Sequence, residues 1–175
     1  MPGERTFALL PVERASLPLL AQFARPIWEE WFTPLLGAAQ VAYMLDRFQS
    51  PRALARQVER EGYRYFFITD GGEAAGYTGV CPDPGGGLFL SKLYLTRSAR
   101  GRGLARKAFA ALCACAREQG LPYIRLTVNR HNTQAIAVYA HLGFQRTGAA
   151  VTDIGGGFVM DDYLYEYRLG ERPRA

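Results

Sequence analysis

The spacing of hydrophobic residues changes character near residue 62 of this chain. Before that point apolar side chains recur every three or four positions, as in Leu20, Phe23 and Ile27, which is the period of a helix with one buried face. Pro26 lacks a backbone N–H, so it should kink or interrupt the first helix. The pattern predicts a strand over 6–12, a helical segment that begins near Ser16, and helices over 37–49 and 52–61.

From Tyr63 onward the pattern is that of strands joined by turns. Aromatic and β-branched residues fill 63–69, and the Asp70-Gly71-Gly72 sequence is typical of a tight turn. We therefore expect 74–81 to return as an antiparallel partner. The remaining pattern predicts strands over 88–95 and 123–128, helices over 103–119 and 133–142, and a last hairpin of 144–154 with 158–169.

The strand, helix and strand between residues 88 and 128 determine the expected fold class. A crossover of this kind places its two strands parallel in one sheet. The fold class is therefore α/β, with a mixed and mostly antiparallel sheet of about six to seven strands, a central parallel pair and helices on both faces. We expect residues 1–170 to form a single domain and 171–175 to be disordered.

Composition narrows the class of protein without naming its function. The 175 residues are 49% hydrophobic and 21% charged, as in an ordinary globular domain. No apolar run approaches the roughly 20 residues of a membrane span, and the N-terminal stretch lacks the apolar centre of a secretory signal. The three cysteines, Cys81, Cys113 and Cys115, match no zinc spacing. We expect a cytoplasmic protein without a metal site or a membrane partner.

A glycine-containing loop leads directly into the helix at 103–119. It reads Arg100-Gly-Arg-Gly-Leu-Ala105. Glycine permits positive φ, and the first turn of a helix has N–H groups with no partner of their own, so such a junction binds phosphate. The side chains of Arg100 and Arg102 are expected to add bidentate phosphate contacts. The loop lacks the Lys-Ser/Thr of a P-loop and the spacing of a dinucleotide fingerprint.

The net charge of +5 gives no support for nucleic-acid binding, because the arginines are scattered and no run of five basic residues occurs. One local cluster surrounds the proposed phosphate loop. A polyanionic cofactor such as coenzyme A accounts for that cluster without nucleic acid. Its members are Arg97, Arg100, Arg102, Arg106 and Lys107.

Two motifs in the right order give the chain a family resemblance. The loop resembles the Arg/Gln-x-x-Gly-x-Gly/Ala pyrophosphate loop of the GCN5-related N-acetyltransferases, with Ala105 where many members have glycine. About thirty residues later the chain resembles that family's Asn-x-x-Ala-x-x-x-Tyr-x-x-x-Gly-Phe segment. The matching residues there are Asn132, Ala135, Tyr139, Gly143 and Phe144. The resemblance covers roughly residues 66–168.

The resemblance implies an acetyl-CoA-dependent N-acetyltransferase that moves an acetyl group directly to a primary amine of a small molecule or peptide. The alternative is a non-catalytic acyl-CoA-binding or interaction module on the same fold. A homodimer is compatible with the fold, and nothing in the sequence specifies its interface. The resemblance places pantetheine on the first three of the expected cofactor contacts, which are Leu93, Tyr94, Leu95, Arg100, Gly101, Arg102, Gly103, Leu104, Ala105 and Asn132.

The transfer also needs a proton donor and a base. The resemblance makes Tyr139 the donor, since a phenol with a pKa of about 10 is protonated at neutral pH. Candidates for the base are Glu29 or Glu30, and Asp161 or Asp162. Neighbouring strand residues face opposite sides of a sheet, so only one of the two aspartates can point inward. We select Glu30 and Asp162. Aromatic residues are expected to wall the acceptor pocket. Those selected are Trp28, Trp31 and Tyr163, and Tyr43 and Tyr165 are further candidates.

Overall fold

The computed structural model describes residues 5–170, which form two compact units. Among the described residues, unit 1 contains 5–81 and 92–111, and unit 2 contains 82–91 and 112–170. The expected disordered tail, 171–175, lies outside the described residues. The expectation of one domain over 1–170 stays a prediction.

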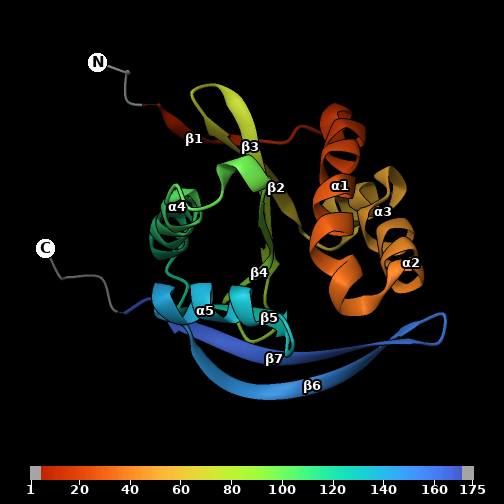
Figure 1. Cartoon of the computed structure of the whole chain (residues 1–175). Helices are drawn as coiled ribbons and strands as arrows, with labels where there is room; N and C mark the ends of the chain where they lie inside the picture. The colour runs from red at the N-terminus through yellow and green to blue at the C-terminus, as the bar shows by residue number, and fades with distance from the viewer. Residues whose placement is uncertain (1–4, 171–175) are drawn as a thin grey trace, which may run out of the picture. The chain divides into compact units, whose positions relative to one another are not determined.

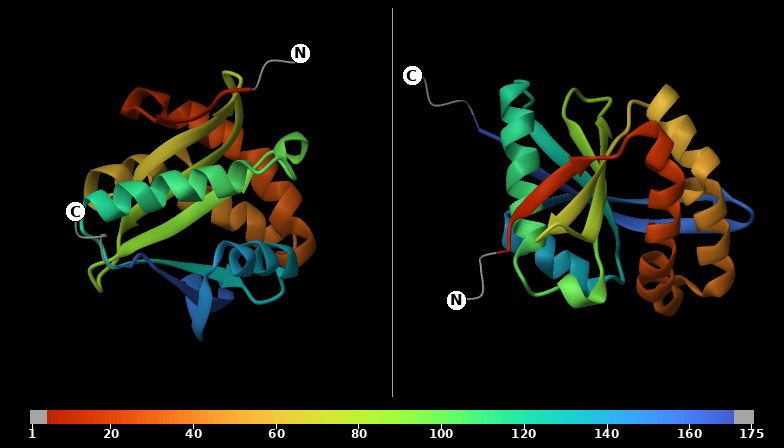
Figure 2. Two further views of the ribbon diagram at one scale, coloured as in Figure 1. Left: turned by 90° about the vertical axis from the view of Figure 1, so that its left-hand side faces the viewer. Right: turned by 90° about the horizontal axis from the view of Figure 1, so that it is seen from above.

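Unit 1 holds the first part of the sheet with helices on both of its faces. Strands β1, β2 and β3 pair antiparallel in chain order, and the tight turn expected at Gly71 joins the last two. Helices α1 to α3 lie on one side of these strands, and the start of α4 lies on the other (Figures 1 and 2). The elements are β1 (Phe7–Pro11), α1 (Leu17–Leu36), α2 (Ala38–Gln49), α3 (Pro51–Arg60), β2 (Arg64–Asp70), β3 (Glu73–Pro82) and the first residues of α4 (Leu104–Glu118).

Helix α1 runs unbroken through Pro26, so the expected interruption there is wrong. A proline inside a helix leaves the carbonyl four residues earlier without its usual donor. Here that carbonyl belongs to Gln22, and both Gln22 and Pro26 are exposed, so water can satisfy the freed group. The buried side of the helix, with Ile27 and Trp28, keeps its packing and holds the helix together.

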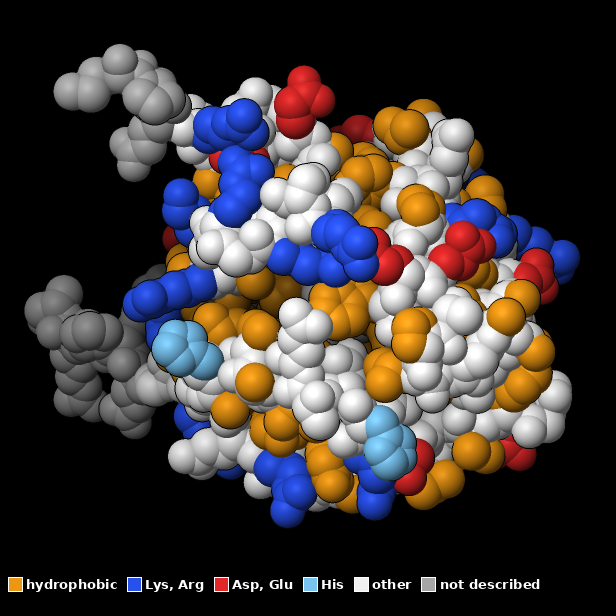
Figure 3. Space-filling model, in the orientation of Figure 1, with side chains coloured by type: hydrophobic (Ala, Val, Ile, Leu, Met, Phe, Trp, Pro, Cys, Tyr) orange, Lys and Arg blue, Asp and Glu red, His pale blue; other side chains and the backbone are white. Residues whose placement is uncertain are grey.

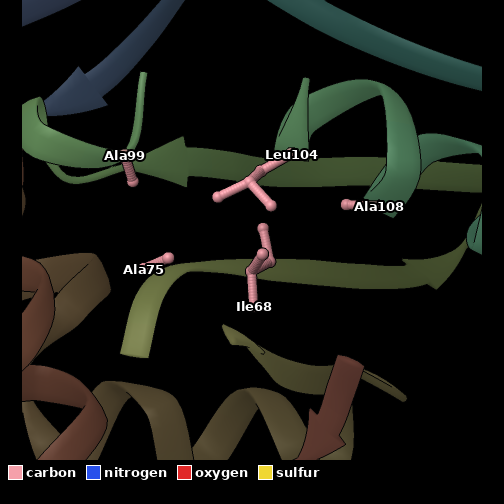
Figure 4. Packing of buried hydrophobic residues seen from close by; sticks show 5 residues of the cluster. All are labelled: Ile68, Ala75, Ala99, Leu104 and Ala108. Atoms are coloured by element: carbon pink, nitrogen blue, oxygen red, sulfur yellow. The ribbon is translucent and has the colours of Figure 1, made fainter. Parts of the chain in front are cut away.

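The core of unit 1 on the α4 side is small and dense. Figure 4 shows Leu104 and Ala108 of α4 facing Ile68 of β2 and Ala75 of β3, with Ala99 beside them. All five are buried, and burial of side chains of this kind stabilises a fold by about 25 cal/mol per Å² of apolar surface. This packing fixes where the first turn of α4 begins.

Unit 2 is built on a long antiparallel hairpin. Strand β7 pairs with β5 on one side and with β6 on the other. Phe144, two residues after the end of α5, packs on Tyr167 of β7, and their ring centroids are 5.7 Å apart. Gly143 has φ of 99° and ends α5 in the left-handed conformation that favours glycine. The elements are β5 (Tyr123–Asn129), α5 (Thr133–Leu142), β6 (Gln145–Gly155) and β7 (Phe158–Arg168).

The strand connections confirm the predicted fold class. Strand β4 (Leu88–Leu95) pairs parallel with β5, with Leu88 opposite Ile124, whereas β1 with β2, β2 with β3, β5 with β7 and β6 with β7 pair antiparallel. The seven strands follow the order β1-β2-β3-β4-β5-β7-β6. Among residues 5–170, no helix has the length and apolar character that crossing a membrane requires.

Candidate functional site

Both glycines of the Arg100–Ala105 loop adopt the positive φ that glycine permits. After a short 3₁₀ turn at Arg97–Ala99, Gly101 and Gly103 both have φ of 74°. A side chain added at either glycine would meet no atom within 4 Å, so the backbone lies open on that side. Helix α4 begins at Leu104, and the backbone N–H of Lys107 donates to the Gly103 carbonyl at 3.1 Å. The N–H groups of this first turn have no earlier carbonyl to bond.

The end of β4 leads into this loop, and the last side chains of the strand pack against other residues of unit 1. Leu93 and Leu95 pack against the small core under α4. Tyr94 points to the other face, where its ring lies 5.7 to 5.8 Å from the rings of Trp28, Phe32 and Tyr77. These side chains pack within unit 1, and the pantetheine contact predicted for Leu93 to Leu95 stays a prediction.

The guanidinium of Arg100 makes hydrogen bonds and a ring contact within unit 1. It donates to Glu30 Oε1 at 2.6 Å and twice to the Leu95 carbonyl, at 3.2 and 3.3 Å, and it stacks over the Trp31 ring at 4.3 Å. Arg102 pairs with the buried carboxylate of Asp70. The structure thus directs both arginines of the loop to protein carboxylates.

The carboxylate of Glu30 is held between two arginines. Arg97 donates to it at 3.3 Å and Arg100 at 2.6 Å. The hydrogen bond from Arg100 is the main cause that lowers the pKa of Glu30 below its ordinary value. A carboxylate in this setting is a weak proton acceptor. Its neighbour Glu29 is exposed and lies 3.4 Å from Arg25 on the same helix.

The aromatic residues expected at the acceptor pocket differ in exposure. Trp28 is a core residue with 5% exposure, and its indole N–H donates to the Tyr77 hydroxyl at 2.6 Å. That hydroxyl in turn donates to Gln49 at 3.0 Å. Trp31 is half-buried, and its indole nitrogen is buried with no hydrogen-bond partner among residues 5–170. Of the two, Trp31 has the free donor.

A buried lysine, which is not among the predicted site residues, lies near this region. Lys92 is 5% exposed, and its amine lies over the rings of Tyr63 and Tyr65, at 4.7 and 5.3 Å. Burial lowers its pKa to about 7. The available signal was its place inside the apolar strand pattern of 88–95, where a charged residue needs a reason.

In unit 2, Asn132 and Tyr139 lie on the same short helix. The Asn132 side chain accepts the N–H of Ala135 at 3.1 Å, so it caps the N-terminus of α5. Tyr139 is half-buried, with its ring 5.7 Å from that of Phe144. Burial raises the pKa of Tyr139 to about 12, which keeps the phenol protonated.

The two neighbouring aspartates of β7 have different environments. Asp161 forms an ion pair with Arg130 at 2.7 Å. Asp162 is half-buried, and its Oδ1 atom is buried without a hydrogen-bond partner among the described residues. Burial, and to a lesser degree the charge of Asp161, raises the pKa of Asp162 to about 6. Tyr163 follows, with the guanidinium groups of Arg130 and Arg146 over its ring at 5.1 and 4.6 Å.

The predicted site residues therefore fall into two sets, each within one unit. Unit 1 brings together the loop, the end of β4, Glu30 and Trp31, with Trp28 in the core beneath. Unit 2 holds Asn132 and Tyr139 on α5, and Asp162 and Tyr163 on β7. In Figure 3, Lys and Arg side chains gather around the start of α4 and the loop before it. The roles of all these residues stay predictions.

Two curated relatives bear the name N-acetyltransferase. An uncharacterized N-acetyltransferase of Escherichia coli (strain K12), YjgM, is 33% identical over 93 residues, which cover 51% of this chain and 56% of that protein. N-acetyltransferase 8 of Rattus norvegicus is 31% identical over 98 residues, covering 53% of this chain and 44% of that protein. The chain thus spans about half the length of these two relatives.

Solved structures share the fold at low sequence identity. The PaiA N-acetyltransferase of Thermoplasma acidophilum, solved in complex with coenzyme A, superposes with a TM-score of 0.76 at 16% identity, over 93% of this chain and 99% of that one. A spermidine N-acetyltransferase, SpeG of Vibrio cholerae, has a TM-score of 0.65 at 15% identity, over 93% and 94%. In sequence, residues 23–144 match the acetyltransferase (GNAT) family. This chain therefore belongs to the acetyltransferase (GNAT) family.

Proposed function

We propose that this protein is an acetyl-CoA-dependent N-acetyltransferase that transfers an acetyl group directly to a primary amine of a small molecule or peptide. The observation that carries the proposal is the open corner at Gly101 and Gly103, which precedes the N-terminus of α4. Membership of the GNAT family and the coenzyme A bound in a solved protein of the same fold support it.

The residues of this corner fit a diphosphate. Both glycines leave their backbone uncovered, and the first turn of α4 offers N–H donors together with the positive end of the helix dipole. Hydrogen bonds to a charged group contribute about 1.5–3 kcal/mol each, so a few aligned donors provide most of the affinity. Bound acetyl-CoA supplies an activated acetyl thioester, and the backbone of Leu93 to Leu95 is proposed to orient its pantetheine arm.

Two side chains of unit 2 are proposed to transfer protons, one as the donor and the other as the base. Tyr139 keeps its proton at neutral pH because burial raises its pKa to about 12, so it is available to protonate the leaving thiolate. Asp162 has a buried oxygen with no partner and a pKa raised to about 6, so it is ionised at neutral pH and more basic than an ordinary carboxylate. We assign Asp162 the role of base towards the acceptor ammonium, directly or through water.

The contacts of Glu30 favour a different role for the other carboxylate that was expected to act as base. Two arginines lower its pKa, which makes it a weaker proton acceptor than an ordinary carboxylate. Trp31, one residue further along α1, keeps an indole N–H without a partner among residues 5–170 and is our proposed contact for the acceptor.

The proposal is tested by a thiol-release assay with acetyl-CoA and a panel of primary amines that includes polyamines, amino acids and short peptides. We expect thiol release that depends on both the amine and the protein, with the acetylated amine detected by mass spectrometry. Binding of acetyl-CoA without thiol release for any amine would instead support the acyl-CoA-binding module. Failure to bind acetyl-CoA at all would contradict both functions.

A further inference from the structure

We propose that Arg100 is a positioning residue rather than a phosphate ligand: held by Glu30 and Trp31 of α1, it fixes the end of β4 and so sets the conformation of the cofactor loop. This inference rests on the proposed function, because the loop it positions is the one assigned to coenzyme A. It also gives Glu30 a structural task in place of a proton transfer.

The geometry around Arg100 assigns all three of its nitrogens to protein acceptors. Nη1 donates to Glu30 Oε1 at 2.6 Å, while Nε and Nη2 donate to the Leu95 carbonyl at 3.3 and 3.2 Å. The Cζ atom of the group lies over the Trp31 ring, 4.3 Å from its centre. Its side chain is 24% exposed. Three of its five N–H groups donate to protein acceptors in this way, so only the remaining two could reach a phosphate.

These contacts close the segment between Leu95 and Arg100 into a fixed loop. Leu95 is the last residue of β4, and Thr96 after it is tied to β3 by its N–H and its hydroxyl, which both donate to the Ala75 carbonyl at 2.9 and 3.3 Å. Arg100 returns across a 3₁₀ turn to the Leu95 carbonyl. The next residue is Gly101, the first of the two glycines at the open corner. A change at Arg100 therefore acts on the corner through the backbone.

Glu30 is what orients Arg100 from outside the loop. Its carboxylate is 35% exposed and lies 70 residues away in sequence, yet it accepts from both Arg97 and Arg100. Two arginines against one carboxylate leave the cluster with a net positive charge, which attracts a polyanion while the geometry is held. Lysine cannot replace arginine here, because only the planar fork can donate to two separate acceptors and stack on an indole at once.

The two roles predict opposite signs for the same substitution, Glu30→Gln. If Arg100 positions the loop, loss of the carboxylate frees it, and we expect the lost loop geometry to outweigh the added positive charge, so that coenzyme A binds more weakly. If Arg100 contacts the diphosphate, loss of a nearby negative charge makes coenzyme A bind more tightly. A third role, Glu30 as base, would leave the affinity unchanged and would lower kcat with loss of its acidic pH limb.

The test measures the Kd of coenzyme A by titration calorimetry, with thermal unfolding of each variant as a check of folding. We expect Glu30→Gln and Arg100→Lys each to weaken binding about five- to tenfold, and the double variant to be no weaker than the worse single variant, since both break one contact. The matched controls are Glu59→Gln and Arg14→Lys, which alter the exposed Arg14–Glu59 pair of the same unit, and these should bind as the wild type does.

Unchanged or tighter binding by Glu30→Gln would overturn the inference, as would additive effects in the double variant. Should Arg100→Lys fail to fold, Glu30→Gln alone still decides between the roles by the sign of its effect. If the wild type itself does not bind coenzyme A, the proposed function has failed instead, and the two failures are therefore distinguishable.

Discussion

The two units hold their candidate chemistry in contrasting ways. In unit 1 the charged side chains of the loop are paired with protein groups, as Arg100 is with Glu30 and Arg102 is with Asp70, while the backbone at Gly101 and Gly103 is left open. In unit 2 the reverse holds, because Asp162 keeps a buried oxygen without a partner among residues 5–170, and burial raises the pKa of Tyr139. Unit 1 offers backbone donors and unit 2 offers titratable side chains.

The contrast is sharpest between the two carboxylates that the sequence makes equal candidates for the base. Two arginines lower the pKa of Glu30, and burial raises that of Asp162 to about 6. The first is therefore less basic than an ordinary carboxylate and the second is more basic. The residue type does not separate them, and the surroundings do.

The largest effect should come from the proton donor of unit 2. Tyr139→Phe removes one hydroxyl and keeps the ring that packs on Phe144. We expect kcat to fall at least tenfold, within the range of about 10²–10⁴ typical of acid catalysis, with a smaller change in cofactor affinity. Steady-state kinetics with acetyl-CoA measures both. Tyr167→Phe, whose ring also packs on Phe144, is the control, and unchanged turnover of Tyr139→Phe would remove the assignment.

The next effect concerns the carboxylate of β7. Asp162→Asn should lower kcat/KM about tenfold or more at neutral pH, because an amide cannot accept the proton. The wild-type rate should rise with pH through about 6 as Asp162 loses its proton, and the variant should lack this limb. A pH profile of both proteins checks it, with Asp153→Asn of the neighbouring strand as the control. A limb that persists in the variant would assign the base elsewhere.

A smaller effect on stability comes from the same substitution. The folded-state pKa of Asp162 is raised from 3.8 to about 6, so the folded chain holds a proton that the unfolded chain has lost in that range. The contribution of Asp162 to the free energy of unfolding therefore falls as pH rises from 4 to 6. Above pH 6, Asp162→Asn should be more stable by about 1 kcal/mol, a modest figure because water screens a half-buried charge. Thermal unfolding at pH 4 and pH 8 measures the difference, and equal shifts at both values would contradict it.

Lys92 provides the opposite slope in unit 1. Its folded-state pKa is lowered from 10.5 to about 7 by burial, so between these values the unfolded chain binds a proton that the folded chain does not. The wild type should gain stability as pH rises above 7, and Lys92→Met should lose that dependence. The difference between the two melting temperatures, followed from pH 7 to pH 10, tests this. A constant difference would show that the amine is charged in the fold.

Much of the fold was predictable because its signals are local. The apolar run of 88–95 predicted the bounds of β4, and the structure confirms them. Asn132 before α5 and Gly143 after it predicted where that helix begins and ends, which the structure also confirms. The error at Pro26 came from the same local reasoning. Whether a proline breaks a helix depends on what satisfies the freed carbonyl, and here both Gln22, which carries that carbonyl, and Pro26 are exposed.

The contacts of the candidate site were less predictable, because they join residues far apart in the chain. Glu30 and Arg100 are 70 residues apart, and the sequence pattern around neither residue predicts that they pair. The difference between Asp161 and Asp162 depends on Arg130, which takes only one of them. The loop conformation was different in kind, since glycine itself indicates positive φ and the structure has it at both positions.

The most direct test of the account is the effect of one methyl group at the open corner on coenzyme A binding. Gly103→Ala places a side chain at φ of 74°, and Gly72→Ala does so at φ of 85° in the turn between β2 and β3, again with no atom within 4 Å. Each should cost about 1–2 kcal/mol of stability. Calorimetry should then show at least tenfold weaker binding of coenzyme A by Gly103→Ala and wild-type binding by Gly72→Ala. Equal affinity in all three proteins would contradict the claim that this backbone holds the diphosphate.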